Sequence, residues 1–289
     1  MKIGFIGAGR AGTALGIYFK SRGEKISGYY SRDIEDAVKA SMLTESVGFS
    51  SIEELLQKTD IVMITTNDDE IEKTAEYISK VKQLRSEHFF IHVSGSLTSK
   101  ALNSLANKGC EVCSMHPMQS IATALQGART LHDTVFTIES DSEAAIEKAI
   151  ILVKRLGNSF QVLKAGDKTI YHAGACVLSN YMVTLAESAF SYFRASGINN
   201  EDILKLTEPL IRSTVDNILL NGTDKALTGP IARGDIKTIE KHLEAIKEKI
   251  PEEEELYKVM GKNTIKIADR IRSEKGQNPL EIGGIFDEK

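Results

Sequence analysis

The first twelve residues contain a glycine pattern that few folds accommodate. An apolar run over residues 2–6 leads directly into Gly-Ala-Gly-Arg-Ala-Gly, and apolar residues then recur at helical spacing over 13–21. Strand, glycine turn and helix in this order are typical of a dinucleotide-binding unit, because the turn lets the backbone approach a pyrophosphate. The free N–H groups of the first helical turn attract the same anion. We therefore predict cofactor contacts from Gly7, Ala8, Gly9, Arg10, Ala11 and Gly12.

The end of the second strand-like segment bears on which dinucleotide binds. This segment covers residues 25–30 and is followed by Ser31 and Arg32. NAD-binding chains usually place Asp or Glu here for the ribose hydroxyl, whereas a hydroxyl and a guanidinium suit a 2′-phosphate. Asp33 is better explained as the start of the next helix. The sequence favours NADP over NAD, with Ser31 and Arg32 as ligands; the alternative is that Arg32 is a surface cation.

Strand-like and helix-like segments alternate through the first half of the chain. Strand-like runs lie at 59–66, 88–96, 110–117, 134–140 and 159–163, and helical patterns lie at 51–58, 67–81, 98–107 and 142–156. This alternation predicts an α/β fold with an N-terminal Rossmann-type, doubly wound parallel sheet. Ligands of such sheets bind beyond the carboxyl ends of the strands, so the residues at these ends are candidates for a site.

Polar residues occupy three of these strand ends. The ribose and nicotinamide side of the cofactor is expected to contact Thr65, Thr66 and Asn67. The next two ends supply Ser94 and Ser96, and then His116. We expect these three side chains to approach the reacting carbon.

His116 is the best candidate for proton transfer. Hydride transfer to a carbonyl or imine must be matched by a proton, and imidazole titrates in a suitable range. Ser94 or Ser96 would orient the substrate or relay that proton. The alternative is that His116 is structural and sets the turn before Pro117.

Composition and cysteine usage limit the classes of partner. The net charge of −4 disfavours nucleic acid and anionic membranes, and no apolar run approaches the about 20 residues of a membrane helix. We expect no signal peptide, and three cysteines in 289 residues indicate a reducing cytoplasm. Cys110 and Cys113 form a C-x-x-C inside a strand-like run, which turns their side chains to different faces. We therefore predict no metal site.

The chain becomes helical in pattern after the last strand-like run. We predict a dinucleotide-binding domain over residues 1–163 and an all-α domain over 164–289, which is expected to complete the active site and to form a homodimer. A single helical pattern covers 166–197. On it His172, Cys176 and Ser179 share one face, with Asn180 beside them. This group, with His172 and Asn180 as site candidates, belongs either to a substrate cleft or to a hydrogen-bonded core or dimer contact.

A second polar group lies in the segment 226–243. Thr228 begins a Thr-Gly-Pro turn, and we predict a functional role for it. Arg233 either binds a substrate carboxylate or pairs with Asp235, and Asp235 is well placed to cap the next helix. The sequence leaves the roles of these two charged residues open.

Six motifs together resemble one bacterial family. They are GFIGAGRAGTAL, YYSRD, HVSGS, SMHPMQS, YHAGACVLSNYMVTL and LTGPIARGD. That family joins a Rossmann-like domain to a helical domain of unknown function and is similar to deazaflavin-dependent NADP reductases, pyrroline-5-carboxylate reductase and prephenate dehydrogenase. The resemblance implies NADP binding, oxidoreductase activity, dimers and a helical domain of the 6-phosphogluconate-dehydrogenase type. It implies no substrate.

Two of these motifs are similar to known substrate-binding segments. The His-Pro-Met at 116–118 is similar to the histidine-proline motif of prephenate dehydrogenases, in which the histidine contacts the substrate hydroxyl. The turn at Thr228 is similar to the substrate loop of pyrroline-5-carboxylate reductase. The chain departs from both patterns, because it lacks the arginines of the prephenate site and the glycine-threonine run that follows the reductase loop.

The sequence thus supports two hypotheses from different classes. The first is an NADP-dependent oxidoreductase that transfers a hydride between nicotinamide and a small carbonyl, imine or hydroxy acid. The alternative is a non-catalytic NADP-binding sensor or interaction protein, which would need the glycine turn and Arg32 but not His116.

Overall fold

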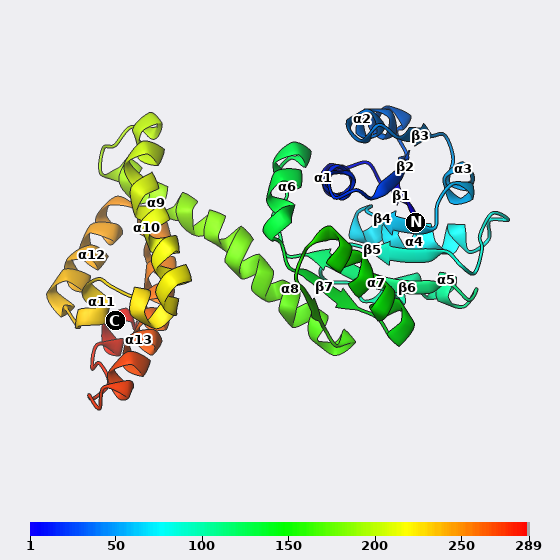
Figure 1. Ribbon diagram of the computed structural model, residues 1–289. Helices are drawn as coiled ribbons and strands as arrows, with labels where there is room; N and C mark the ends of the chain where they lie inside the picture. Colours follow the sequence, from blue (N-terminus) through cyan, green and yellow to red (C-terminus); the bar gives the residue numbers. More distant parts are fainter. Residues whose placement is uncertain (288–289) are drawn as a thin grey trace. The chain divides into compact units, whose positions relative to one another are not determined.

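The computed structural model describes residues 1–287 and divides the chain into two compact units, Met1–Asn180 and Tyr181–Lys289. The first unit contains a sheet of eight strands in the order β3-β2-β1-β4-β5-β6-β7-β8 (Figure 1). The strands are β1 (Lys2–Ile6), β2 (Lys25–Tyr30), β3 (Val47–Phe49), β4 (Ile61–Ile64), β5 (Phe89–His92), β6 (Glu111–Pro117), β7 (Phe136–Glu139) and β8 (Phe160–Val162). The order of the first six is that of the Rossmann fold, so the predicted fold class is confirmed.

The sheet departs from the prediction at two places. All described strand pairs are parallel except β6 with β7, where Pro117 lies opposite Phe136. The chain between them forms α6 (Ala124–Thr130) and the 3₁₀ turn η2 (Leu131–Asp133) and re-enters the sheet at the end it left, which requires no crossover. The edge strand β3 was not predicted, because three residues are too few for a visible alternation.

Helices cover both faces of the sheet. On one face the buried residues come from α1 (Arg10–Ser21), α2 (Ile34–Thr44) and α7 (Glu143–Leu156). On the other they come from α3 (Ile52–Gln57), α4 (Asp68–Ile78), the 3₁₀ turn η1 (Ser99–Leu102) and α5 (Asn103–Ala106). The helix predicted over 98–107 is therefore a 3₁₀ turn followed by one short α-helical turn. Ser51 caps α3, and Asp33 caps α2 as its position predicted.

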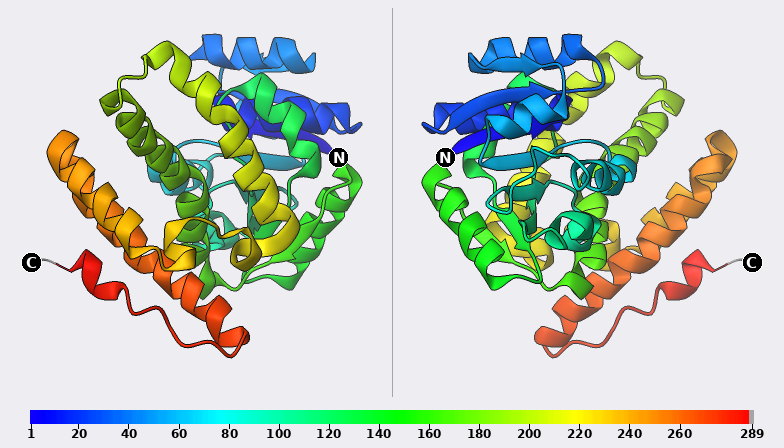
Figure 2. Two further views of the ribbon diagram at one scale, coloured as in Figure 1. Left: turned by 90° about the vertical axis from the view of Figure 1, so that its left-hand side faces the viewer. Right: turned by 90° about the vertical axis from the view of Figure 1, so that its right-hand side faces the viewer.

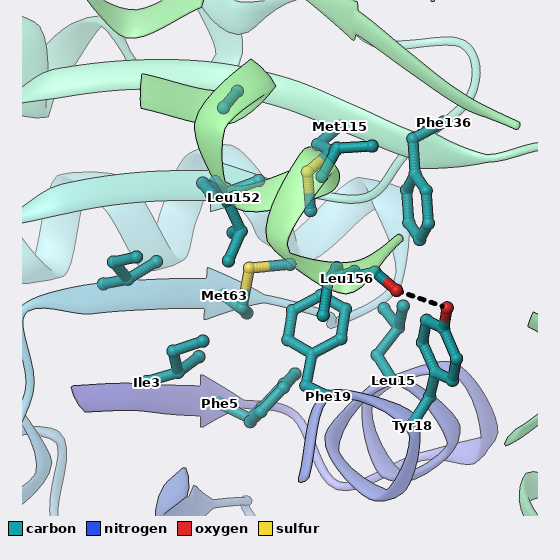
Figure 3. Packing of buried hydrophobic residues seen from close by; sticks show 14 of the residues in the cluster. Ile3, Phe5, Leu15, Tyr18, Phe19, Met63, Met115, Phe136, Leu152 and Leu156 are labelled. Atoms are coloured by element: carbon teal, nitrogen blue, oxygen red, sulfur yellow. Dashed lines mark hydrogen bonds between the residues drawn. The ribbon is translucent and has the colours of Figure 1, made fainter. Parts of the chain in front are cut away.

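The core on the α1 face fixes that helix against the sheet. Phe19 of α1 packs near Phe5 of β1, and Figure 3 shows Leu15 and Tyr18 in the same cluster. Each fully buried large apolar side chain contributes about 2 kcal/mol. The hydroxyl of Tyr18 lies 3.2 Å from the carbonyl oxygen of Leu156, which joins α1 to the end of α7. The start of α1 is thereby held at the carboxyl end of β1.

The helical pattern at 166–197 is interrupted. A 3₁₀ turn, η3 (Ala165–Asp167), precedes α8 (Lys168–Cys176); a π-helical turn, η4 (Val177–Tyr181), then separates α8 from α9 (Met182–Ala195). The predicted boundary near 163/164 follows the end of the sheet, whereas the compact units divide at 180/181. The physical reason is that Lys168 at the start of α8 is buried in the first unit, as described below.

The second unit is all-α, as predicted. Beyond α9 it comprises α10 (Asn200–Ala226), α11 (Pro230–Arg233), α12 (Ile236–Lys249), the 3₁₀ turn η5 (Pro251–Glu253), α13 (Glu254–Glu274) and the 3₁₀ turn η6 (Gly283–Phe286), in yellow to red in Figure 2. Its small core is formed by Ile239, Ile265, Ile282 and Phe286. Asp235 caps α12, accepting hydrogen bonds from the backbone N–H and the hydroxyl of Thr238. None of the helices within residues 1–287 is long and apolar enough to span a bilayer.

The close packing of α1 leads to a stability prediction. A Cβ atom on Gly16 would overlap the hydroxyl oxygen of buried Tyr29. We expect Gly16→Ala to lower the free energy of unfolding by about 1–3 kcal/mol, because the core must shift to make room. Urea unfolding followed by circular dichroism measures this loss.

A matched glycine on α8 provides the control. Gly174 is also helical, and a Cβ atom added to it would have no other atom within 4 Å. Gly174→Ala is expected to leave the stability unchanged or to raise it by about 0.5–1 kcal/mol. Equal effects of the two substitutions would contradict the packing argument.

Candidate functional site

The glycine turn lies where the strand order reverses. β1 pairs with β2 on one side and with β4 on the other, and α1 begins directly after the turn. Gly7 has a φ of +108°, and a Cβ atom there would lie 2.8 Å from the backbone of Thr65. The hydroxyl of Thr65 donates to the carbonyl oxygens of Gly7 (2.7 Å) and Ile6 (3.2 Å). Thr65, predicted to contact the cofactor, therefore has its hydroxyl proton directed at the turn.

A first pocket of about 400 Å³ extends from this turn to the end of β2. Gly9 lines this pocket, and a Cβ atom added to Gly9 would have no contact within 4 Å. Gly9 is also the N-cap residue of α1, so no side chain occupies the N–H groups at the start of that helix. At the far end are Ser31 and Arg32, together with Lys73 of α4. Lys73 forms a 2.9 Å ion pair with Glu70. The pocket thus has open backbone amides at one end and two cations at the other.

A second pocket of about 420 Å³ continues along the strand ends. It shares four predicted residues with the first pocket, namely Gly9, Thr65, Thr66 and Asn67. It adds five more: Arg10, Ala11, Ser94, His116 and His172. Arg10 donates to the carbonyl oxygen of Ala122 (3.3 Å). The hydroxyl oxygen of Thr66 is buried and has no hydrogen-bond partner in the described part of the chain.

The two predicted serines converge on one carboxylate. Ser94 and Ser96 donate to the same oxygen of Asp68, the first residue of α4, at 2.8 and 2.9 Å. The hydroxyl oxygen of Ser94 also accepts from the N–H groups of Ser96 and Leu97. Asp68 therefore organises the loop after β5, and each hydroxyl proton is already directed at it.

His116 lies on β6 between the second and third pockets. Its Nδ1 is 3.0 Å from the hydroxyl oxygen of Tyr171 on α8. Its Nε2 faces the backbone of Gly95, where a Cβ atom would lie 2.9 Å away. Burial, followed by the positive charge of Lys168 and the ring of His172, lowers the pKa of His116 to about 4. The imidazole is therefore neutral at physiological pH.

Lys168 is the main residue of this region that the sequence did not indicate. Its side chain is 1% exposed, and its Nζ donates to the carbonyl oxygen of Ser94 (2.9 Å) and to the hydroxyl of Ser114. These bonds join the start of α8 to the loop after β5 and to the middle of β6. Burial lowers the lysine's pKa to about 8, although Glu139, Cys113 and Asp68 oppose the shift. A charged ammonium thus lies directly behind the loop that contains Gly95.

The predicted polar face, which the structure divides between α8 and η4, borders a third pocket of about 610 Å³. His172, Cys176, Ser179 and Asn180 all line it, next to His116. The sulfur of Cys176 lies 3.9 Å from each ring nitrogen of His172, and Ser179 donates to the side-chain oxygen of Asn180 (3.0 Å). Helical spacing alone predicted this grouping.

Other candidates are not part of these pockets. Gly12 is buried in α1, where a Cβ atom would overlap the oxygen of Gly7, so its role is packing. Thr228 and Arg233 belong to the second unit and do not line these pockets. Cys110 and Cys113 contribute to the cores on opposite faces of the sheet, as predicted. Within residues 1–287 no three His, Cys, Asp or Glu side chains cluster closely enough to hold a metal.

The strand order and the glycine turn define the first unit as a Rossmann-type domain. Residues 1–117 match the family model of a Rossmann-like domain, and residues 134–264 match that of a domain of unknown function, DUF2520. The chain thus unites a Rossmann-like domain with DUF2520, which confirms the resemblance of its motifs. No curated protein sequence is significantly similar to this chain.

Solved structures share this fold over nearly the whole chain. Protein TM1727 from Thermotoga maritima has 24% sequence identity and a TM-score of 0.72, covering 94% of this chain and 99% of its own. A candidate NADP oxidoreductase from Bacteroides fragilis has 19% sequence identity and a TM-score of 0.70, covering 91% of this chain and 97% of its own. An imine reductase from Myxococcus stipitatus in complex with NADP⁺ has 17% sequence identity and a TM-score of 0.64, covering 99% of this chain and 99% of its own. At these identities the similarity establishes the fold.

The buried lysine leads to a prediction about His116. In Lys168→Met we expect the pKa of His116 to rise toward the ordinary value of about 6.5, because a nearby positive charge is removed. Titration of the imidazole C–H signals by NMR measures this change. The free energy of unfolding should also fall by about 1–3 kcal/mol, since Ser94 O and Ser114 Oγ lose their donor.

A lysine in the preceding loop is the control. Lys164→Met removes the same charge from an exposed position. It is expected to change neither the pKa of His116 nor the free energy of unfolding. An unchanged pKa in the Lys168 variant would show that burial alone keeps His116 neutral.

Proposed function

We propose that this protein is an NADP-dependent oxidoreductase that acts on a small carbonyl, imine or hydroxy-acid substrate. One observation supports this most directly: the first pocket, which includes Arg32, and the second pocket, which includes His116, share four lining residues at the glycine turn and the end of β4. A dinucleotide is the class of cofactor that spans such a path at the strand-order reversal. The similarity in fold to the imine reductase that was solved with NADP⁺ also supports an oxidoreductase role.

The residues present fit NADP. The open position at Gly9 allows the backbone to approach a pyrophosphate, and the uncapped start of α1 offers N–H groups to it. Arg32 and Ser31 at the end of β2 suit the 2′-phosphate, and the unpartnered hydroxyl of Thr66 would gain a polar partner. Asn67 borders both pockets and would bind next to it. When bound, the reduced nicotinamide supplies a hydride.

The chain's own residues would complete the reaction by managing the matching proton. His116 is neutral, so it would act as a hydrogen-bond donor to the substrate oxygen or nitrogen rather than as an imidazolium acid. His172 and Asn180 are proposed to position the substrate in the second and third pockets. Ser96 does not line these pockets, and Ser94 and Ser96 are together proposed to hold the loop after β5 through Asp68. Thr228, as part of the second unit, stays a candidate for substrate contact.

We further propose a cytoplasmic homodimer that forms through the second unit. Helix α9 has no buried residue although it is largely apolar, and Leu219 and Leu220 of α10 are 78% and 81% exposed. Apolar side chains in such numbers are typical of an interface. The three free cysteines fit a reducing compartment. Light scattering of the purified protein measures the number of subunits, and a monomer would contradict the dimer.

Cofactor choice is tested at Arg32. In Arg32→Ala the affinity for NADPH is expected to fall roughly 10- to 100-fold, while that for NADH changes little, because one charged hydrogen bond to the extra phosphate is lost. Isothermal calorimetry measures both affinities. Arg212→Ala, at an exposed arginine of α10, is the control and should leave both unchanged. Equal losses for both nucleotides in the Arg32 variant would exclude the assigned phosphate contact.

Turnover is tested at His116. Nicotinamide absorbance is followed across a panel of keto acids, aldehydes and imines, and His116→Gln is expected to lower kcat by roughly 10²- to 10⁴-fold, the usual worth of a positioned proton donor. His132→Gln, at an exposed histidine that pairs with Asp133, should retain full activity. Tight NADPH binding without turnover of any substrate would instead support the non-catalytic sensor.

A further inference from the structure

Tyr171 forms a hydrogen bond with His116, and the proposed function assigns no role to this tyrosine. It lies on α8, and its hydroxyl oxygen is 3.0 Å from Nδ1 of His116, with the two rings nearly perpendicular at 85°. The same oxygen accepts from the hydroxyl of Thr137 on β7 at 3.2 Å. The sulfur of Met118, a weak acceptor, lies 3.6 Å away.

The two tautomers of His116 differ in the acceptor of the phenol proton. A tyrosine hydroxyl has a single proton and can accept through its lone pairs. In the Nε2–H tautomer the phenol donates to Nδ1, and the hydroxyl of Thr137 donates to the phenol oxygen or to the backbone carbonyl oxygen of His116. In the Nδ1–H tautomer the ring nitrogen donates to the phenol oxygen, and the phenol proton is left to the sulfur of Met118. The phenol proton therefore has a nitrogen acceptor only in the Nε2–H tautomer.

The protonated nitrogen is also the one that faces the pockets. Nε2 lies over the backbone of Gly95, and His116 borders both the second and the third pocket. Glycine is needed there, because a Cβ atom would come within 2.5 Å of the ring of His172 and 2.9 Å of Nε2. No side chain of residue 95 thus separates Nε2 from a substrate.

We propose that Tyr171 is the positioning residue that holds His116 as an Nε2–H donor toward the substrate. This inference rests on the proposed function for its catalytic meaning, although the tautomer itself does not depend on turnover. Tyr171 acts through the imidazole and defines which ring nitrogen meets the substrate oxygen or nitrogen.

The charges around His116 keep this donor neutral. Lys168 and His172 from α8 oppose protonation, and Asp68 from α4 favours it less strongly than burial disfavours it. Burial raises the pKa of Tyr171, so its phenol keeps its proton and remains a donor to Nδ1. Both partners are therefore uncharged at neutral pH before the reaction begins.

The proton that the substrate gains is replaced from water. The hydride forms a new C–H bond and the π bond of the substrate opens onto its oxygen or nitrogen, which takes the Nε2 proton. Nδ1 then takes the phenol proton, so the imidazole never becomes negatively charged. Water returns a proton to the phenol oxygen, which completes the cycle.

Long-range ¹H–¹⁵N NMR of the histidine rings tests the proposal in the full-length protein. The wild type should show the Nε2–H tautomer of His116 without any ligand. Tyr171→Phe should populate both tautomers, because the donor to Nδ1 is lost. Thr137→Val is the matched control, since it removes a hydroxyl of the same cluster and leaves the partner of Nδ1 in place.

Each outcome decides the question. An Nδ1–H tautomer in the wild type, an unchanged tautomer in Tyr171→Phe, or an equal change in Thr137→Val would overturn the proposal. With an active substrate, Tyr171→Phe is expected to lower kcat roughly three- to ten-fold, the worth of one hydrogen bond, with the KM for NADPH unchanged. If no substrate is turned over, the proposed function fails, and the NMR result still tests the role of Tyr171.

Discussion

The hydrogen bonds from Thr65 to the glycine turn are the constraint on which the rest of the site depends. They join the end of β4 to the end of β1 at the point where the strand order reverses. Gly7 can accept this close approach because its φ of +108° and its missing Cβ leave room for the backbone of Thr65. Thr65 lines both the first and the second pocket, so these hydrogen bonds lie where the two pockets adjoin.

The buried ammonium group of Lys168 is the second constraint on the site. Lys168 holds the start of α8 against the loop after β5 and against the middle of β6, so Tyr171 and His172 one turn further along the helix face His116. Burying an ammonium group is costly unless it is well bonded. Here the cost is offset by two acceptors, and the same charge helps to keep His116 neutral. One side chain thus determines both the geometry and the electrostatics of the site.

Local motifs identified most of the predicted residues that line the first pocket, but only part of the residues that surround His116. The glycine spacing, the residues at the end of β2 and the polar face of α8 were recognisable because each is defined within a few turns of chain. Lys168 and Tyr171 were not, since a lysine and a tyrosine on a helix resemble ordinary surface residues until the sheet is placed beside them. Asp68 lies in the first turn of α4 as an ordinary helix-start residue, but it also accepts hydrogen bonds from the hydroxyls of two serines in the loop after β5.

The sequence by itself determined the Rossmann-type order of strands and helices, the all-α character of the remainder and the position of the glycine turn. The reason is that periodicity, glycine spacing and helix caps are properties of neighbouring residues. Tertiary structure decided that β7 runs antiparallel to β6, that a π turn interrupts the helix after α8, and which partners surround His116. These features depend on contacts such as that between residues 116 and 171, which only the folded chain brings within 3.0 Å.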